Sequence, residues 1–410
     1  MLEDIRVLEL SGPFTMMAGQ ILADLGAEVV AIEPPEGARG RRMEPFLDDV
    51  PGLDRSLTWQ ALNRNKRGMT LRTDSADGRT LLEQLAHTVD IILEELPPGG
   101  TSVLAGCGLP QTLIHAQITS FSKDGPKAHY RSSDLALMAA SGAPALAGEP
   151  GRPPLFFPVP QAMMEAGAES AVAALAALAA RDCDGRGQAA DVSARTAAIA
   201  SGLSRVIAGF AGDTLPVRSA TTGAGLSGVR SVPGMYTCAD GYMVMSIVFG
   251  AAFLPMTRQM VKWAIDEGEL APEYADAAWQ AFGRSAAASP ASRAPIDALV
   301  DAVSRLCRTR TKQQLAATAR AYKFMAAPVN TMADIAASPQ FRERGLFTST
   351  TVSPDGRAID IPARFIQFSD YSIETRRPAP RLSEHSMEIL SGDLGLSGAE
   401  IQALFVHGVI

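Results

Sequence analysis

The first 32 residues alternate between two hydrophobic periods, and this alternation most constrains the fold of the chain. Residues 5–10 alternate apolar and polar side chains as a half-buried strand does, whereas residues 16–25 repeat apolar positions at helical spacing. Residues 27–32 return to the strand pattern. A strand, a helix and a strand in this order form a βαβ unit, whose two strands run parallel.

The same alternation continues along the chain. Residues 78–88 have helical spacing, residues 89–93 form an apolar strand-like run, and residues 113–121 supply another strand candidate. Strands that alternate with helices favour a mostly parallel sheet covered on both faces. We therefore predict an α/β fold whose large domain is Rossmann-like and doubly wound.

The pattern changes near residue 225, which indicates a second domain. Residues 236–246 are typical of a hairpin, and helical segments follow to about residue 322. A length of 410 residues accommodates a large domain and a smaller one. We predict a large domain over residues 1–224, a small α+β domain over residues 225–326, and a return to the large domain over residues 327–410.

Charge and composition exclude several classes of partner. The net charge of −7, with scattered Lys and Arg, excludes the dense basic face that nucleic acid requires. The longest apolar run, residues 171–180, is too short to span a bilayer, and the acidic N-terminus does not resemble a signal or transit peptide. The four cysteines form no CxxC motif and no histidine has metal-ligand spacing, so we expect no metal site. We expect a cytoplasmic protein that binds neither nucleic acid nor membrane.

Six sequence blocks occur in a fixed order. They are Leu22–Val30 followed by Ile32–Pro35, Asn63–Arg67, Gly187–Ser193, Asp240–Tyr242, Ala327–Thr331 and Pro378–His385. In this order they resemble the family III CoA-transferases, the group of the formyl-CoA and carnitine CoA-transferases. The resemblance implies an interlocked dimer and implies coenzyme A as a substrate, with no further cofactor.

The family's catalytic step requires an aspartate, which attacks an acyl-CoA thioester and becomes acylated. The resemblance places it in the pattern V-P-x-x-D-x-x-x-G, and here Val159, Pro160 and Gly167 match while Met163 stands at the nucleophile position. A thioether cannot form an acyl anhydride. We therefore predict no catalytic residue in this chain.

Two carboxylates near that position are weak candidates for catalysis. Glu165 lies two residues further on, about 200° around a helix from the required face. Asp134 matches the aspartate of a His-Asp pair that the racemase branch of the family uses, but Ser133 replaces the histidine. Because racemisation needs a base on each side of the carbon, that chemistry is not expected.

Recognition of coenzyme A is only partly retained. The resemblance implies phosphate contacts from Arg39, Arg41, Arg42, Lys66 and Arg67, whose blocks carry such contacts in the family. The family's E-N-F-R-P-G turn reads Glu94–Gly99 here, so its Asn and Arg are lost and the carboxylate of Glu95 has appeared.

Three hypotheses of function follow. The first is the non-nucleophilic subunit of a hetero-oligomeric CoA-transferase, which moves CoA between succinyl-CoA and an organic acid such as an aromatic succinate, beside a related subunit that carries the aspartate. The second is a homomeric acyl-CoA lyase, hydratase or epimerase that uses Glu165, Glu169 or Asp134 as its base. The third is a non-catalytic, regulatory family member. A nicotinamide-dependent oxidoreductase is excluded because residues 11–17 lack the G-x-G-x-x-G turn.

Overall fold

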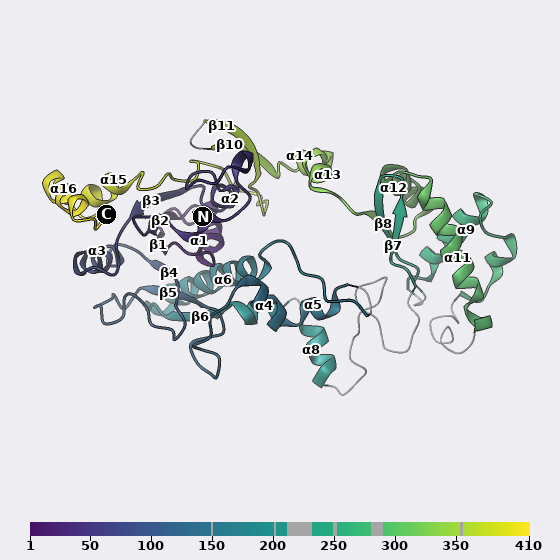
Figure 1. Ribbon diagram of the computed structural model, residues 1–410, viewed down its shortest axis with the longest axis horizontal. Coiled ribbons are helices and arrows are strands. Elements are labelled where there is room, and N and C mark those ends of the chain that lie inside the picture. Colours follow the sequence, from purple (N-terminus) through teal and green to yellow (C-terminus); the bar gives the residue numbers. More distant parts are fainter. Residues whose placement is uncertain (149–150, 201, 211–231, 249–251, 280–289, 353–355) are drawn as a thin grey trace. The chain divides into compact units, whose positions relative to one another are not determined.

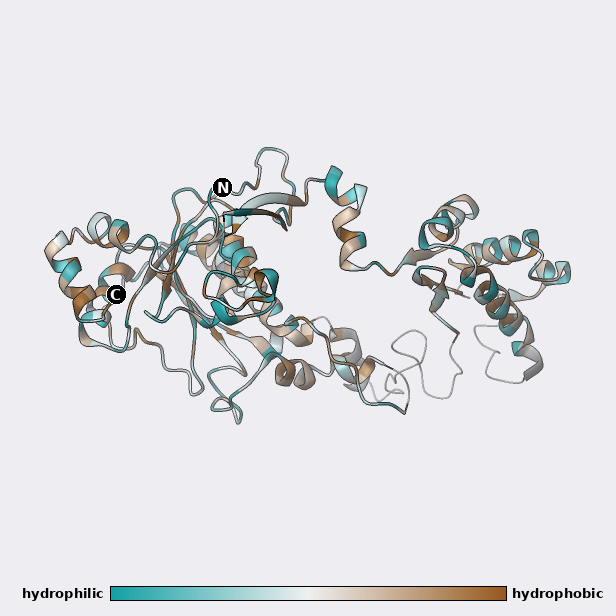
Figure 2. Ribbon diagram, turned by 45° about the horizontal axis from the view of Figure 1, so that its top comes forward, coloured by the Kyte–Doolittle hydropathy of each residue, from teal (hydrophilic) through white to brown (hydrophobic). Residues whose placement is uncertain are grey.

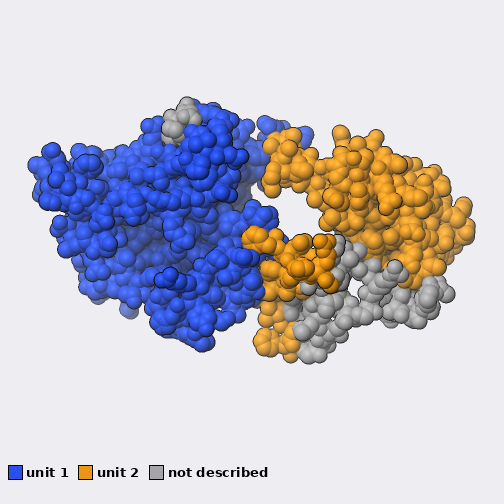
Figure 3. All heavy atoms as spheres, viewed as in Figure 1, with its two compact units in different colours: residues 1–141, 157–201, 339–410 blue, residues 142–156, 202–338 orange. Residues whose placement is uncertain are grey.

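The computed structural model describes residues 1–410 except 149–150, 201, 211–231, 249–251, 280–289 and 353–355 (Figure 1). It contains two compact units (Figure 3). Unit 1 comprises residues 1–141, 157–201 and 339–410, and unit 2 comprises residues 142–156 and 202–338. The domain boundaries expected from the sequence, at residues 225 and 327, stay a prediction.

Unit 1 is built on a six-stranded parallel sheet, which confirms the predicted α/β class. Its strands, in spatial order, are β3 (Lys66–Thr70), β2 (Glu28–Glu33), β1 (Arg6–Leu10), β4 (Ile91–Glu95), β5 (Ile114–Thr119) and β6 (Ala189–Ser193). This order is that of a doubly wound, Rossmann-like sheet, and it reverses between β1 and β4.

Helices cover both faces of this sheet because successive strand residues point to opposite sides. On one face, Val7 and Ile91 pack against α1 (Thr15–Asp24) and α6 (Gln161–Asp184). On the other face, Leu8 and Ile92 pack among the side chains of α3 (Ala76–Ala86), α15 (Ser386–Gly392) and α16 (Gly398–Val406). Brown, apolar segments run along these strands in Figure 2.

Helix α6 packs closely against α1, as its small residues predict. A Cβ added at Gly167 would lie 2.6 Å from the Cβ of Met17, so glycine permits this approach. By length and composition α6 is also apolar enough to cross a membrane, but 50% of that stretch is buried. A core helix of this length and composition passes the same test, so one such helix among the described residues is weak evidence for a membrane span.

Shorter elements surround the sheet of unit 1. They are η1 (Arg39–Arg42), η2 (Leu47–Asp49), α2 (Leu57–Leu62), α4 (Asp134–Ser141), α7 (Ala194–Ala200), α14 (Pro339–Glu343) and the antiparallel strands β10 (Phe347–Val352) and β11 (Arg357–Pro362). The C-terminal residues therefore add helices and a hairpin to the unit that the N-terminal residues begin.

Unit 2 has a core of its own. Strands β7 (Met235–Cys238) and β8 (Gly241–Met245) confirm the predicted hairpin, and β9 (Ala326–Pro328) extends it to three antiparallel strands. Trp263 stacks on Phe324 with ring centroids 5.2 Å apart in the core of this unit. Its other elements are α5 (Ala143–Leu146), α8 (Leu203–Phe210), α9 (Leu254–Asp266), η3 (Pro272–Asp276), α11 (Pro290–Arg308), α12 (Lys312–Tyr322) and α13 (Met332–Ala337).

Candidate functional site

A cavity of about 1070 Å³ lies at the carboxyl ends of β1 and β4, where the strand order reverses. Ligands of open α/β sheets bind in the crevice at this position. Its walls come from the loop after β1, from η1, from the turn after β4 and from the start of α6. The residues that line this cavity include Phe14, Arg39, Arg42, Glu95, Arg131, Asp134 and Met163.

A second cavity of about 430 Å³ lies over the carboxyl ends of β1, β2, β3 and β4. It shares Pro13, Arg39, Glu95 and Val103 with the first, so the two cavities border one another. Met163 lines the cavity of about 1070 Å³, which we call the inner cavity. We call the cavity of about 430 Å³ the outer cavity.

Met163 occupies the first turn of α6 and lines the inner cavity. Its side chain is 2% exposed and belongs to a cluster with Met16 and Trp59, against which Met17 and Met164 also pack. The position that the family pattern assigns to a nucleophile is therefore filled by a buried thioether in a methionine-rich cluster.

Asp134 holds the start of α6 in place. Its Oδ1 accepts a hydrogen bond of 2.9 Å from the backbone N–H of Met163. Burial raises the pKa of Asp134, while hydrogen bonds from the backbone N–H groups of Met163, Ala162 and Gln161 lower it. Asp134 lines the inner cavity and also caps the helix.

Glu165 lies near Asp134 but is not among the described residues that line the inner cavity. Burial raises the pKa of Glu165, and the neighbouring Asp134 carboxyl raises it further. The Oδ2 atom of Asp134 and the Oε2 atom of Glu165 are both buried without a hydrogen-bond partner in the described part of the chain. The two weak catalytic candidates therefore lie near one another, and the carboxyl group of Asp134 acts on the pKa of Glu165.

Arg39 and Arg42 project from η1 to the inner cavity. The side chain of Arg39 is 80% exposed, and its Nη1 atom lies 4.0 Å from Oε1 of Glu95. Arg42 donates to backbone oxygens of Gly37, at 2.9 Å, and Glu36, at 2.7 Å. The structure therefore brings together two of the five arginine and lysine side chains that the family resemblance assigns to coenzyme A.

The structure places Lys66 and Arg67 elsewhere. Lys66 is fully buried, and its Nζ donates to Oε2 of Glu9 at 2.7 Å and to Oδ1 of Asn63 at 2.8 Å. Burial lowers the pKa of Lys66, and Glu9 opposes this change. Arg67 contacts three carboxylates, those of Glu28, Glu388 and Asp393. Neither side chain is among the described residues lining the inner or outer cavity.

The remaining residues of the Asn63–Arg67 block also have buried partners. Asp24 in α1 accepts hydrogen bonds from Gln20 at 2.7 Å, from Asn65 at 3.0 Å and from Arg64. Burial raises the pKa of Asp24 to about 6, although Arg64 opposes this shift. In this structure the block joins β3 to α1 and to the C-terminal part of the chain.

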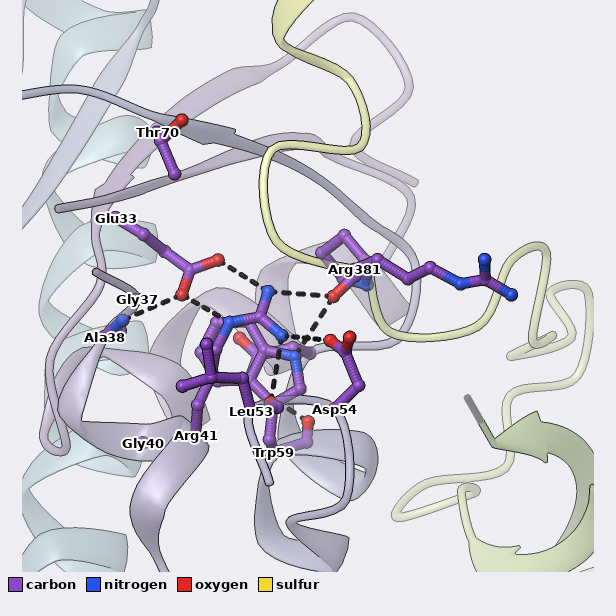
Figure 4. Close-up of polar contacts among 12 residues, drawn as sticks. Glu33, Gly37, Ala38, Gly40, Arg41, Leu53, Asp54, Trp59, Thr70 and Arg381 are labelled. Carbon is purple, nitrogen blue, oxygen red and sulfur yellow. Dashed lines mark hydrogen bonds and ion pairs between the residues drawn. The ribbon is translucent and has the colours of Figure 1, made fainter. Parts of the chain in front are cut away.

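Arg41, which the resemblance also implied as a phosphate contact, is not among the described residues lining either cavity and fixes the loop that carries Arg39 and Arg42. Its guanidinium donates to both carboxylate oxygens of Glu33, at 2.6 and 2.7 Å (Figure 4). It also donates to Asp54 at 2.8 Å and to the backbone oxygen of Pro380 at 3.0 Å, and it lies 4.0 Å from the ring centroid of Trp59. The nearest partner in sequence is Glu33, the acidic residue that ends β2. Asp54 lies 13 residues from Arg41, and Pro380 lies 339 residues from it.

No group of three or more His, Cys, Asp and Glu side chains that could hold a metal ion occurs among the described residues. The cavities are lined instead by arginines, carboxylates and apolar side chains at the crevice of a Rossmann-like sheet. These features define an α/β protein with a site suited to an extended ligand that has an anionic end.

Residues 2–386 match the profile of CoA-transferase family III, and the chain belongs to this family. It is 28% identical over 415 residues to succinyl-CoA:(R)-benzylsuccinate CoA-transferase subunit BbsE of Thauera aromatica, covering 99% of this chain and 97% of that protein. It is also 28% identical to succinate–glutarate CoA-transferase of Agrobacterium fabrum, with 95% of each chain covered.

The fold resembles that of solved family members. The crystal structure of a CAIB/BAIF family protein from Brucella suis superposes with a TM-score of 0.77 at 26% identity, covering 95% of this chain and 98% of that one. The family and fold expected from the ordered sequence blocks are thereby confirmed.

Proposed function

We propose that this chain is the non-nucleophilic subunit of a hetero-oligomeric CoA-transferase. The complex moves CoA between succinyl-CoA and an organic acid, such as an aromatic succinate. The observation that carries the proposal is Met163, a buried thioether at the edge of the inner cavity where the family pattern has its aspartate. The similarity over nearly full length to a protein described as a CoA-transferase subunit supports it.

The chemistry requires a second chain. Transfer proceeds through an acyl-enzyme, and only a carboxylate can be both the nucleophile and the leaving group in these steps. We propose that the nucleophilic aspartate belongs to a related family III subunit, which forms an interlocked dimer with this chain. We propose that this complex forms in the cytoplasm.

Arg39 and Arg42 are the proposed contacts for the phosphates of coenzyme A, which is a substrate and needs no further cofactor. Guanidinium groups bind phosphate oxygens in charge-assisted hydrogen bonds, and both side chains line the inner cavity. The same role for Lys66 and Arg67 stays a prediction, and their contacts with Glu9, Glu28, Glu388 and Asp393 do not support it.

Purification from native cells tests the proposal. We expect a second family III chain, with an aspartate in its V-P-x-x-D pattern, to co-purify with this chain in equal amount. The complex should transfer CoA from succinyl-CoA to benzylsuccinate, the reaction in the name of the relative from Thauera aromatica. Replacing the partner's aspartate with alanine should abolish transfer. CoA transfer by this chain alone would overturn the proposal.

One observation favours a second candidate, a homomeric acyl-CoA lyase, hydratase or epimerase. Asp134 and Glu165 lie near one another with two buried, unpartnered oxygens among the described residues, and the pKa of each is raised, which makes each a stronger base. This candidate predicts that the chain alone exchanges the α-proton of an acyl-CoA with deuterium oxide, and that Glu165→Gln stops the exchange. If no exchange occurs, the pair has no such role.

A further inference from the structure

Glu95 is the last residue of β4. This strand neighbours β1 at the point where the strand order reverses. Its side chain lies against Gly12, where an added Cβ would be 2.4 Å from Oε2 of Glu95. The backbone N–H of Phe14, the residue that precedes α1, donates to the same oxygen at 3.4 Å. The carboxylate therefore lies at the start of α1, where the N–H of Phe14 and the helix dipole favour an anion, while the N–H groups of Thr15 and Met16 donate to the backbone oxygen of Gly12.

Glu95 has little compensation from other charges. Arg39 is its one ion-pair partner among the described residues, at 4.0 Å, and is itself mostly exposed. The adjacent Glu94 is occupied by His115 at 2.8 Å and by Ser102, and Glu33 is occupied by Arg41. The other charged residues that line the two cavities are Glu36, Arg42, Arg72, Asp74, Arg131 and Asp134.

Arg39 and Glu95 line both cavities, so they stand where the inner and outer cavities meet. A ligand that extends from one cavity into the other therefore passes beside this ion pair. Its phosphates would compete with the Glu95 carboxylate for Arg39 and for the start of α1. Burial raises the pKa of Glu95, while Phe14 and Arg39 oppose the shift, so the carboxyl group is able to take up a proton when another anion approaches.

We propose that Glu95 determines the specificity of this site. Its carboxylate occupies the anion position at the start of α1, and coenzyme A binds at this position only when Glu95 takes up a proton. This inference rests on the proposed function in one respect only, which is the identity of the ligand. Ionised Glu95 weakens the binding of any ligand that carries phosphate to the border of the two cavities. Protonated Glu95 removes the repulsion and also releases Arg39 to the phosphates.

Calorimetry of CoA binding to the purified chain, in two buffers with different ionisation enthalpies, tests this proposal. We compare the wild-type chain with Glu95→Gln and with the matched control Glu36→Gln, which removes the same charge from an exposed side chain of the outer cavity. The 3′-phosphate of CoA itself titrates near neutral pH, but it contributes equally in all three proteins. The difference between wild type and Glu95→Gln therefore counts the proton that Glu95 takes up.

We expect Glu95→Gln to bind CoA about tenfold more tightly than wild type at pH 8, with less proton uptake and a weaker pH dependence. Glu36→Gln should keep the wild-type proton uptake. Equal or weaker binding by Glu95→Gln, or proton uptake unchanged in it, would overturn the proposal, and so would undetectable binding by all three proteins. A failure here leaves the subunit role open, because that role is measured by transfer in the complex.

Discussion

Asp134 accepts a hydrogen bond from the backbone N–H of Met163 at 2.9 Å, so a carboxylate from α4 caps the helix whose first turn carries the substituted position. The cap does not depend on the side chain at residue 163, since it uses the backbone. The backbone position of residue 163 is therefore fixed in a way that does not depend on which side chain it carries.

Asp134→Ala should lower the free energy of unfolding by about 1 kcal/mol, because α6 loses its capping acceptor. Asp134→Asn keeps an acceptor oxygen and should lose clearly less. Urea denaturation of the two variants measures the difference. Equal losses would show that the charge of Asp134, and not the hydrogen bond to Met163, stabilises the start of α6.

Met163→Ala should lower the free energy of unfolding by roughly 2–5 kcal/mol, because the side chain is buried in the methionine-rich cluster. The transfer rate of the complex should change little, since no bond is made to this residue. Met163→Asp should remain inactive as an isolated chain, because restoring a carboxylate leaves the Glu95 charge at the start of α1. A robustly active Met163→Asp chain would show that the CoA site is intact.

Arg39→Ala should affect CoA binding, whereas Lys66→Ala should affect the stability of the fold. Arg39 is exposed at the border of the cavities, so its loss should weaken CoA binding about tenfold with little change in stability. Loss of Lys66 leaves Glu9 buried without its partner and should cost roughly 3–5 kcal/mol of stability. Calorimetry and urea denaturation measure both effects. A stable Lys66→Ala chain with weakened CoA binding would support the family assignment for Lys66 instead.

Asp24 should make stability depend on pH between about 4 and 6. The pKa of Asp24 is about 6 in the folded chain and 3.8 in an unperturbed aspartate, so the native state binds more protons in this range. The contribution of Asp24 to the free energy of unfolding therefore falls as the pH rises from 4 to 6. Asp24→Asn should lack this fall, which chemical denaturation at several pH values would detect. A wild-type stability that rises through this range relative to Asp24→Asn would contradict the raised pKa.

Hydrophobic periodicity predicted β1, α1, β2, β4 and β5 because their buried positions carry apolar side chains. It did not predict β3, whose first residues are Lys66 and Arg67. Periodicity treats such residues as exposed, whereas here Glu9 and three other carboxylates neutralise them. Glu9 lies 57 residues away and Glu388 lies 321 residues away, and a pattern within one segment contains no such information.

The candidate site could be predicted from the sequence only in part. The position of Met163 followed from the family pattern, because Val159, Pro160 and Gly167 match that pattern on both sides of it. The role of Arg41 did not follow, since its partners Asp54 and Pro380 come from separate parts of the chain. The meeting of Arg39 and Glu95 at the border of two cavities likewise required the strand order of the sheet.

The central claim is that this chain never carries the acyl group. The most direct measurement is to incubate the native complex with succinyl-CoA, trap the acyl-enzyme with hydroxylamine, and locate the modified residue by mass spectrometry. We predict modification of the aspartate of the partner subunit and none on this chain. A hydroxamate on Glu95, Asp134, Glu165 or any other carboxylate of this chain would contradict the account.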